Sequence, residues 1–77
     1  MEKAEILSKL KEIVLQLNKT SEITEETALI SEKILDSLEF MNYLTLVEET
    51  FDISISDSDI EKYQLGKISN MIDYLSR

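Results

Sequence analysis

The 77-residue chain carries 16 acidic and 8 basic side chains, which gives a formal net charge of −8. It contains one Gly and no Cys, His, Trp or Pro. Without Cys there is no disulfide framework, zinc finger or thiol nucleophile. Without His the chain lacks the side chain best suited to acid–base catalysis near neutral pH, and its acidity disfavours binding to nucleic acid. We therefore expect that, if this protein takes part in chemistry, it does not supply the reactive group itself.

The length and the 43% apolar content predict one small domain with its own core, spanning residues 1–77. The N-terminal stretch mixes charged and apolar residues without a continuous apolar segment, so it predicts neither a signal peptide nor a membrane span. We expect a cytoplasmic monomer that does not bind membranes.

The first segment of the chain predicts an amphipathic helix of about 15 residues. Its apolar residues keep a helical period and form one stripe: Ile6, Leu7, Leu10, Ile13, Val14 and Leu17. Turn-prone residues at positions 18–21 are expected to end this helix.

Residues 21–35 predict a long loop, because their apolar side chains keep no long period. We expect these side chains to pin the loop to the core: Ile23, Leu29, Ile30, Ile34 and Leu35. A loop of this length in so small a domain is often functional.

Asp36 and Glu39 have the spacing of a capping box, so a second helix is predicted to begin after Asp36 and to run to about Phe51. Ser56 resembles the N-cap of a short third helix, and Gly66 indicates a turn after it. A fourth helix is predicted from four apolar residues with helical spacing: Ile68, Met71, Ile72 and Leu75. The expected fold is an all-α four-helix bundle with three longer helices, one short helix and a long loop between helices 1 and 2.

The second helix has apolar residues on two faces. One face forms a stripe suited to the core: Phe40, Tyr43, Leu44, Val47 and Phe51. Leu38 and Met41 fall close to the opposite side, where they predict a partner-binding surface. The alternative is that the long loop folds over these two side chains and covers them.

The negative charge is concentrated in the middle of the chain. Residues 21–36 carry five acids and one base, and residues 37–56 carry four acids and no base. This field predicts steering of a basic partner towards the Ser37 end of the second helix. The alternative is an ordinary solvated face. The acids lack the spacing of a calcium-binding loop, so no metal site is predicted.

The stretch from Leu35 to Glu39, followed by the sequence LVEETFDI at 46–53, resembles the acyl and peptidyl carrier proteins. The resemblance covers nearly the whole chain, including its helix order and acidity. It implies that Ser37 is esterified with 4′-phosphopantetheine from coenzyme A, whose thiol holds an acyl or aminoacyl group as a thioester. The protein would then carry its cargo between partner enzymes without catalysing a reaction.

The resemblance also implies which enzymes the carrier meets and where. The partners are a phosphopantetheinyl transferase, an acyl- or aminoacyl-loading enzyme, and a ketosynthase or other synthase or transferase component with a basic docking face. The partner-binding residues, carried over by position, are Asp36, Leu38, Glu39, Met41, Glu48 and Glu49.

Several positions differ from the fatty-acid type of carrier. Asn42 stands where that type usually has an acid, and Phe40 and Tyr43 are also departures. Ile34 and Leu35 replace a Gly-containing turn, and the link at 63–67 is about two residues longer. These features favour a stand-alone carrier of polyketide, nonribosomal peptide or related specialised biosynthesis. The alternatives are the housekeeping fatty-acid carrier, a D-alanyl carrier, or a small acidic adaptor that is never modified.

Overall fold

The computed structural model describes residues 2–17 and 22–76, and within them the regular structure consists of four α-helices. They are α1 (Lys3–Leu17), α2 (Ser37–Phe51), α3 (Asp57–Lys62) and α4 (Ile68–Leu75). Three of these helices have eight residues or more and α3 has six, which confirms the predicted all-α fold. The turn expected at 18–21 lies outside the described residues.

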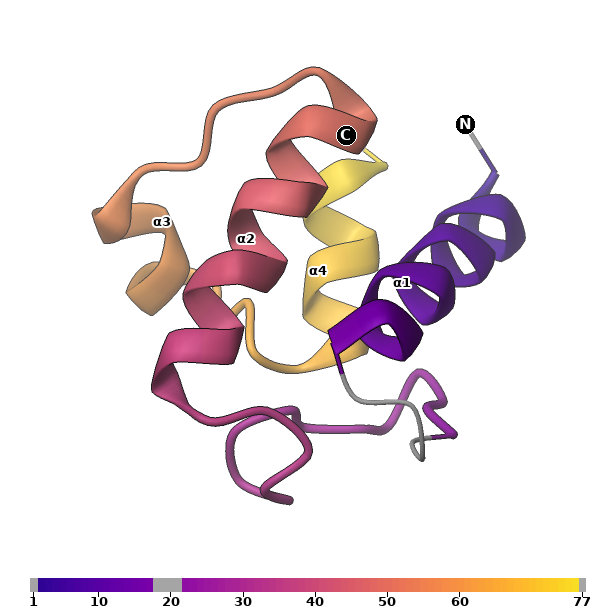
Figure 1. The fold of residues 1–77 in the computed structure, drawn as a ribbon. Helices are drawn as coiled ribbons and strands as arrows, with labels where there is room; N and C mark the ends of the chain where they lie inside the picture. Colours follow the sequence, from indigo (N-terminus) through magenta and orange to yellow (C-terminus); the bar gives the residue numbers. More distant parts are fainter. Residues whose placement is uncertain (1, 18–21, 77) are drawn as a thin grey trace.

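The helices enclose one apolar core. α1 packs against both α2 and α4, while α3 lies at the edge of the bundle (Figure 1). The core residues come from α1, α2, α4 and the connecting segments: Ile6, Leu10, Ile13, Val14, Ile23, Leu29, Leu35, Tyr43, Leu44, Val47, Leu65, Ile68, Met71 and Ile72. Removing each such side chain from water contributes about 1.5–3 kcal/mol. None of the described helices is both long and apolar enough to cross a lipid bilayer.

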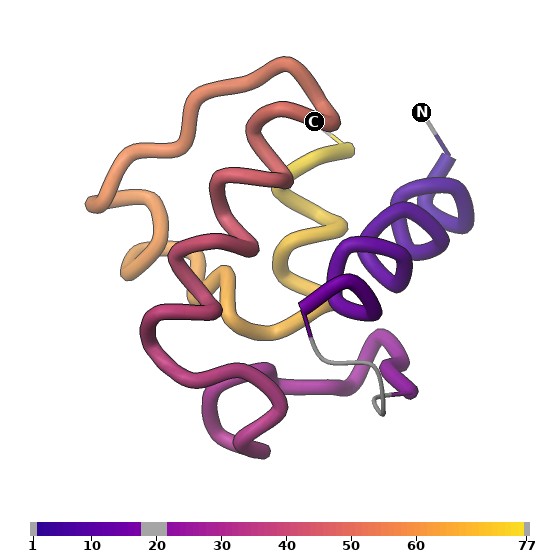
Figure 2. Tube along the Cα trace, in the orientation of Figure 1, coloured from indigo at the N-terminus to yellow at the C-terminus, as the bar shows by residue number. Residues whose placement is uncertain are grey.

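The long connection between α1 and α2 passes across the end of the bundle where α2 and α4 begin (Figure 2). Leu29 and Leu35 point into the core and are almost fully buried, as predicted. Ile30 was also expected to pin the loop, and this prediction was wrong, because 43% of its surface is exposed. The backbone turns tightly here, with the N–H groups of Ile34 and Leu35 both donating to the Leu29 carbonyl. Because of this turn, the Leu29 side chain is buried in the core while the next side chain, Ile30, is exposed.

Backbone hydrogen bonds join this connection to the turn before α4. The Leu29 N–H donates to the Gly66 carbonyl at 2.8 Å, and the Ile68 N–H donates to the Thr27 carbonyl at 2.9 Å. Ala28 and Lys67 form an isolated antiparallel bridge between the two segments. The segment that leads into α2 is thus fixed by bonds to the segment that leads into α4.

Gly66 lies in the predicted turn, but no left-handed backbone is required of it. Its φ is not positive, and the left-handed residue of this turn is Gln64, with φ 50°. A Cβ added at Gly66 would lie 4.0 Å from the Phe40 side chain, an ordinary contact. Lys33 and Asp52 are also left-handed, with φ values of 60° and 54°. Each such non-glycine residue costs on the order of 1 kcal/mol.

Two side-chain hydrogen bonds fix the short helix α3. The Ser56 hydroxyl accepts from the Asp59 N–H and caps α3, as the sequence predicts. The Tyr74 hydroxyl of α4 donates to the Asp59 carboxylate at 2.7 Å. This bond holds the short helix α3, which has no fully buried residue of its own, against α4.

Candidate functional site

Ser37 is the first residue of α2, and its side chain is exposed. Asp36 precedes it with an extended backbone and accepts the Glu39 N–H on its side chain at 2.8 Å. The Glu39 carboxylate accepts the Asp36 N–H in return at 3.1 Å. This reciprocal pair confirms the predicted capping box and fixes the residue at which α2 begins. Ser37 is thereby held in the first turn of the helix.

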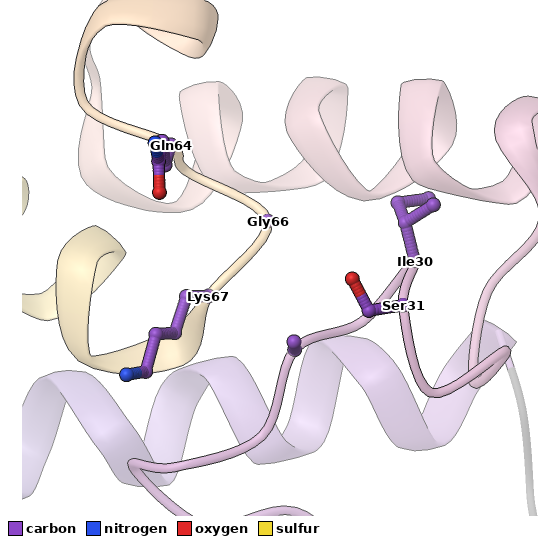
Figure 3. Close-up of a pocket in the computed structure, with 6 residues that line it drawn as sticks. Ile30, Ser31, Gln64, Gly66 and Lys67 are labelled. Carbon is purple, nitrogen blue, oxygen red and sulfur yellow. The ribbon is translucent and has the colours of Figure 1, made fainter.

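An open hollow of about 490 Å³, here called the serine hollow, lies beside Ser37. It is lined by Ile30, Lys33, Ile34, Leu35, Asp36, Ser37 and Glu39. A second hollow of about 230 Å³ lies between residues 28–31 and 64–67 and shares Ile30 with the first. Figure 3 shows Ile30 and Ser31 on one side of it and Gln64 and Gly66 on the other. The surface next to Ser37 is therefore concave and partly apolar.

Leu38 and Met41 are exposed on the outer face of α2, with 73% and 56% of their surface accessible. The alternative in which the long loop covers them is wrong. The loop instead directs Leu29 and Leu35 into the core. An exposed apolar pair therefore follows directly after Ser37, as the partner-binding interpretation requires.

Three of the acids predicted to bind partners also make hydrogen bonds within the chain. Asp36 and Glu39 form the capping box, and the Glu48 carboxylate accepts the Ile55 N–H at 2.7 Å. Glu49 is exposed. The bond of Glu48 was missed by the sequence analysis, because it depends on the chain reversal at Asp52 that follows α2. Glu48 therefore has a structural function whatever else it contacts.

Replacing Glu48 by Ala is expected to destabilise the bundle by about 1–2 kcal/mol, because the half-buried Ile55 N–H loses its charged acceptor. Chemical denaturation followed by circular dichroism measures this change. Glu49→Ala is the matched control, since Glu49 is exposed on the same helix, and its free energy of unfolding should change by less than about 0.5 kcal/mol. Equal effects of the two variants would contradict the assigned bond.

The surroundings of Ser37 fit a phosphopantetheine group. The hydroxyl is on an exposed residue, and the first N–H groups of a helix, together with its dipole, favour an attached phosphate. The serine hollow offers the apolar side chains of Ile30 and Ile34 and the basic Lys33 beside it. The position of Lys33 at the site was not predictable from the sequence, because it depends on the left-handed turn.

Residues 8–75 match the protein family described as "Phosphopantetheine attachment site". The chain is also 41% identical over 64 residues to the "Acyl carrier protein" of Syntrophus aciditrophicus (strain SB), an alignment that covers 82% of this chain and 78% of the relative. No solved structure matches the chain significantly. These similarities define a carrier protein, which is not an enzyme and which works through covalently attached 4′-phosphopantetheine. The chain belongs to the phosphopantetheine-attachment family, which includes the acyl carrier proteins.

Proposed function

We propose that Ser37 is the attachment residue and that the protein delivers an acyl or aminoacyl thioester to partner enzymes. The observation that carries this proposal is the exposed position of Ser37 at the start of α2, inside the matched residues 8–75 and beside an open hollow. The thiol of the bound group supplies the reactive sulfur that a chain without Cys lacks. The residues around Ser37 hold the attachment point in place.

In the attachment step the Ser37 oxygen forms a bond to the phosphorus of the phosphopantetheine part of coenzyme A. The bond from that phosphorus to the bridging oxygen breaks, and adenosine 3′,5′-bisphosphate leaves. The hydroxyl proton passes to a base of the transferase. The chain itself presents Ser37 in the first turn of α2, whose start the hydrogen bonds between Asp36 and Glu39 cap.

Incubation with coenzyme A and a phosphopantetheinyl transferase tests the proposal. The intact mass is expected to rise by one phosphopantetheine unit, and peptide mapping is expected to place the added mass on Ser37. A carrier of established activity, mixed into the same reaction, shows that the transferase is active. An unmodified chain beside a fully converted carrier would overturn the proposal.

The proposed partner surface consists of Asp36, Leu38, Glu39, Met41, Glu48 and Glu49. Support comes from the exposure of Leu38 and Met41 next to Ser37 and from the excess of acids in residues 21–56. This surface suits the basic docking faces of a phosphopantetheinyl transferase, a loading enzyme and a ketosynthase or other synthase component.

Replacing Leu38 by Asn is expected to lower the rate at which the transferase modifies the chain about fivefold or more, at carrier concentrations below KM. The reason is that an apolar contact at the centre of an interface is worth more than about 1 kcal/mol. Leu15→Asn is the matched control, since Leu15 is an exposed leucine on α1. Initial rates by mass spectrometry provide the measurement. Equal rates for both variants would show that Leu38 is not part of the partner surface.

For the pathway we propose polyketide, nonribosomal peptide or related specialised biosynthesis, in the cytoplasm and as a monomer. The support is the aliphatic pair before the motif, of which Leu35 is buried, and the stacked pair Phe40 and Tyr43 inside α2, with ring centroids 5.7 Å apart. The fatty-acid carrier and the D-alanyl carrier are the alternatives. Loading of the modified protein by an adenylation enzyme, a malonyl transferase and a D-alanine ligase in parallel distinguishes them.

A further inference from the structure

We propose that the ammonium group of Lys33 binds the phosphodiester that links the prosthetic group to the chain. This inference rests on the proposed attachment at Ser37. It names a second residue of the attachment site, one that the partner surface does not include. The ligand is an anionic phosphodiester, and the recognising group is a primary ammonium beside it.

The turn before α2 places Lys33 at the site. Its N–H donates to the Ile30 carbonyl at 3.0 Å, and its φ of 60° reverses the direction of the chain. The next two N–H groups donate to the Leu29 carbonyl. As a result Lys33 and Ser37, four positions apart, line the same hollow.

The carboxylates around Ser37 make a nearby cation favourable for an attached phosphodiester. The carboxylates of Asp36 and Glu39 are held beside Ser37 by the capping box, and both line the serine hollow. A phosphodiester adds a further negative charge to this surface, and like charges at short distance repel. Lys33 is the only basic residue in the sequence from 21 to 56.

Lys33 is also available for a new ionic contact. The ion pairs between described residues join Lys3 to Asp73 at 3.2 Å and Lys67 to Glu26 at 3.9 Å. Lys33 forms no such pair with any residue that the structure describes, although acids surround it in the sequence. Lys33 therefore lines the serine hollow with a charge that no described residue pairs.

Nuclear magnetic resonance of the lysine side chains tests the inference on uniformly labelled protein before and after modification. Attachment of the phosphodiester is expected to change the chemical shift of the Lys33 side-chain nitrogen, because the ammonium gains an anionic partner. Near 1 M salt, where charges are strongly screened, the difference should disappear. Lys11, an exposed lysine on α1, should give the same side-chain resonance in both forms.

A second measurement uses the phosphorus resonance of the modified protein. Lys33→Gln is expected to shift this resonance, and the matched variant Lys11→Gln is expected to leave it unchanged. An identical Lys33 side-chain resonance in both forms, with the added mass present, would overturn this inference alone. A chain that gains no mass would overturn the attachment at Ser37, and the intact mass gives this result before any spectrum is recorded.

Discussion

Replacement of Ser37 by Ala is expected to abolish modification by the transferase completely, while the bundle stays folded. The loss is expected to be complete because, in the proposed attachment, the Ser37 oxygen is itself the atom that bonds to phosphorus. The fold should survive because the Ser37 side chain is exposed and makes no hydrogen bond to a described residue. The free energy of unfolding should change by less than about 0.5 kcal/mol.

Ser31→Ala is the matched control for this experiment. Ser31 is also exposed and lies in the same connection, in the hollow next to that of Ser37. This variant should be modified at the rate of the wild type. Intact mass gives the extent of modification, and thermal unfolding shows that both variants are folded. Modification of a folded Ser37→Ala variant would show that the attachment residue is not Ser37.

Replacement of Tyr43 by Phe is expected to stabilise the protein by about 1–2 kcal/mol. The Tyr43 side chain is fully buried, and its hydroxyl has no hydrogen-bond partner among the described residues. A buried polar group without a partner costs about 1–3 kcal/mol, and loss of one oxygen leaves only a small void. For a chain of this size the gain corresponds to a rise in Tm of roughly 4–8 °C or more.

Tyr74→Phe is the control with the opposite expected sign. The Tyr74 hydroxyl donates to the Asp59 carboxylate at 2.7 Å, so its removal should destabilise the protein by about 1 kcal/mol or more. Differential scanning calorimetry of the two variants and the wild type measures both changes. A Tyr43→Phe variant less stable than the wild type would show that the hydroxyl has a partner.

The pH dependence of the same variants provides an independent check. Burial raises the pKa of the Tyr43 hydroxyl above its ordinary value of 10.0. The folded protein therefore keeps this proton more tightly than the unfolded chain does, and stability is lost as pH rises above 10. Tyr43→Phe lacks this group, so its advantage over the wild type should grow in that range.

The helices were predictable because their signals are local. The spacing of Asp36 and Glu39 predicted the start of α2, and four apolar residues predicted α4 with its observed bounds. The links between segments were not predictable, because they depend on reversals at Lys33, Asp52 and Gln64. A positive φ at Lys33 or Gln64 leaves no mark in the sequence, whereas Gly66 correctly predicted the turn in which Gln64 lies.

The surroundings of Ser37 were predictable in part, for the same reason. Helical period placed Leu38 and Met41 opposite the core stripe but left open whether the long loop covers them, and the structure shows both exposed. The position of Lys33 in the serine hollow and the bond of Glu48 to Ile55 both require a fold in three dimensions. Sequence period reports which face a residue occupies, but not which distant segment meets it.

The capping box has a consequence for the order of folding and modification. The start of α2 is fixed by Asp36 and Glu39, which flank Ser37. The helix therefore does not need the Ser37 side chain as a cap. We therefore expect the unmodified chain to be folded already when a transferase meets it.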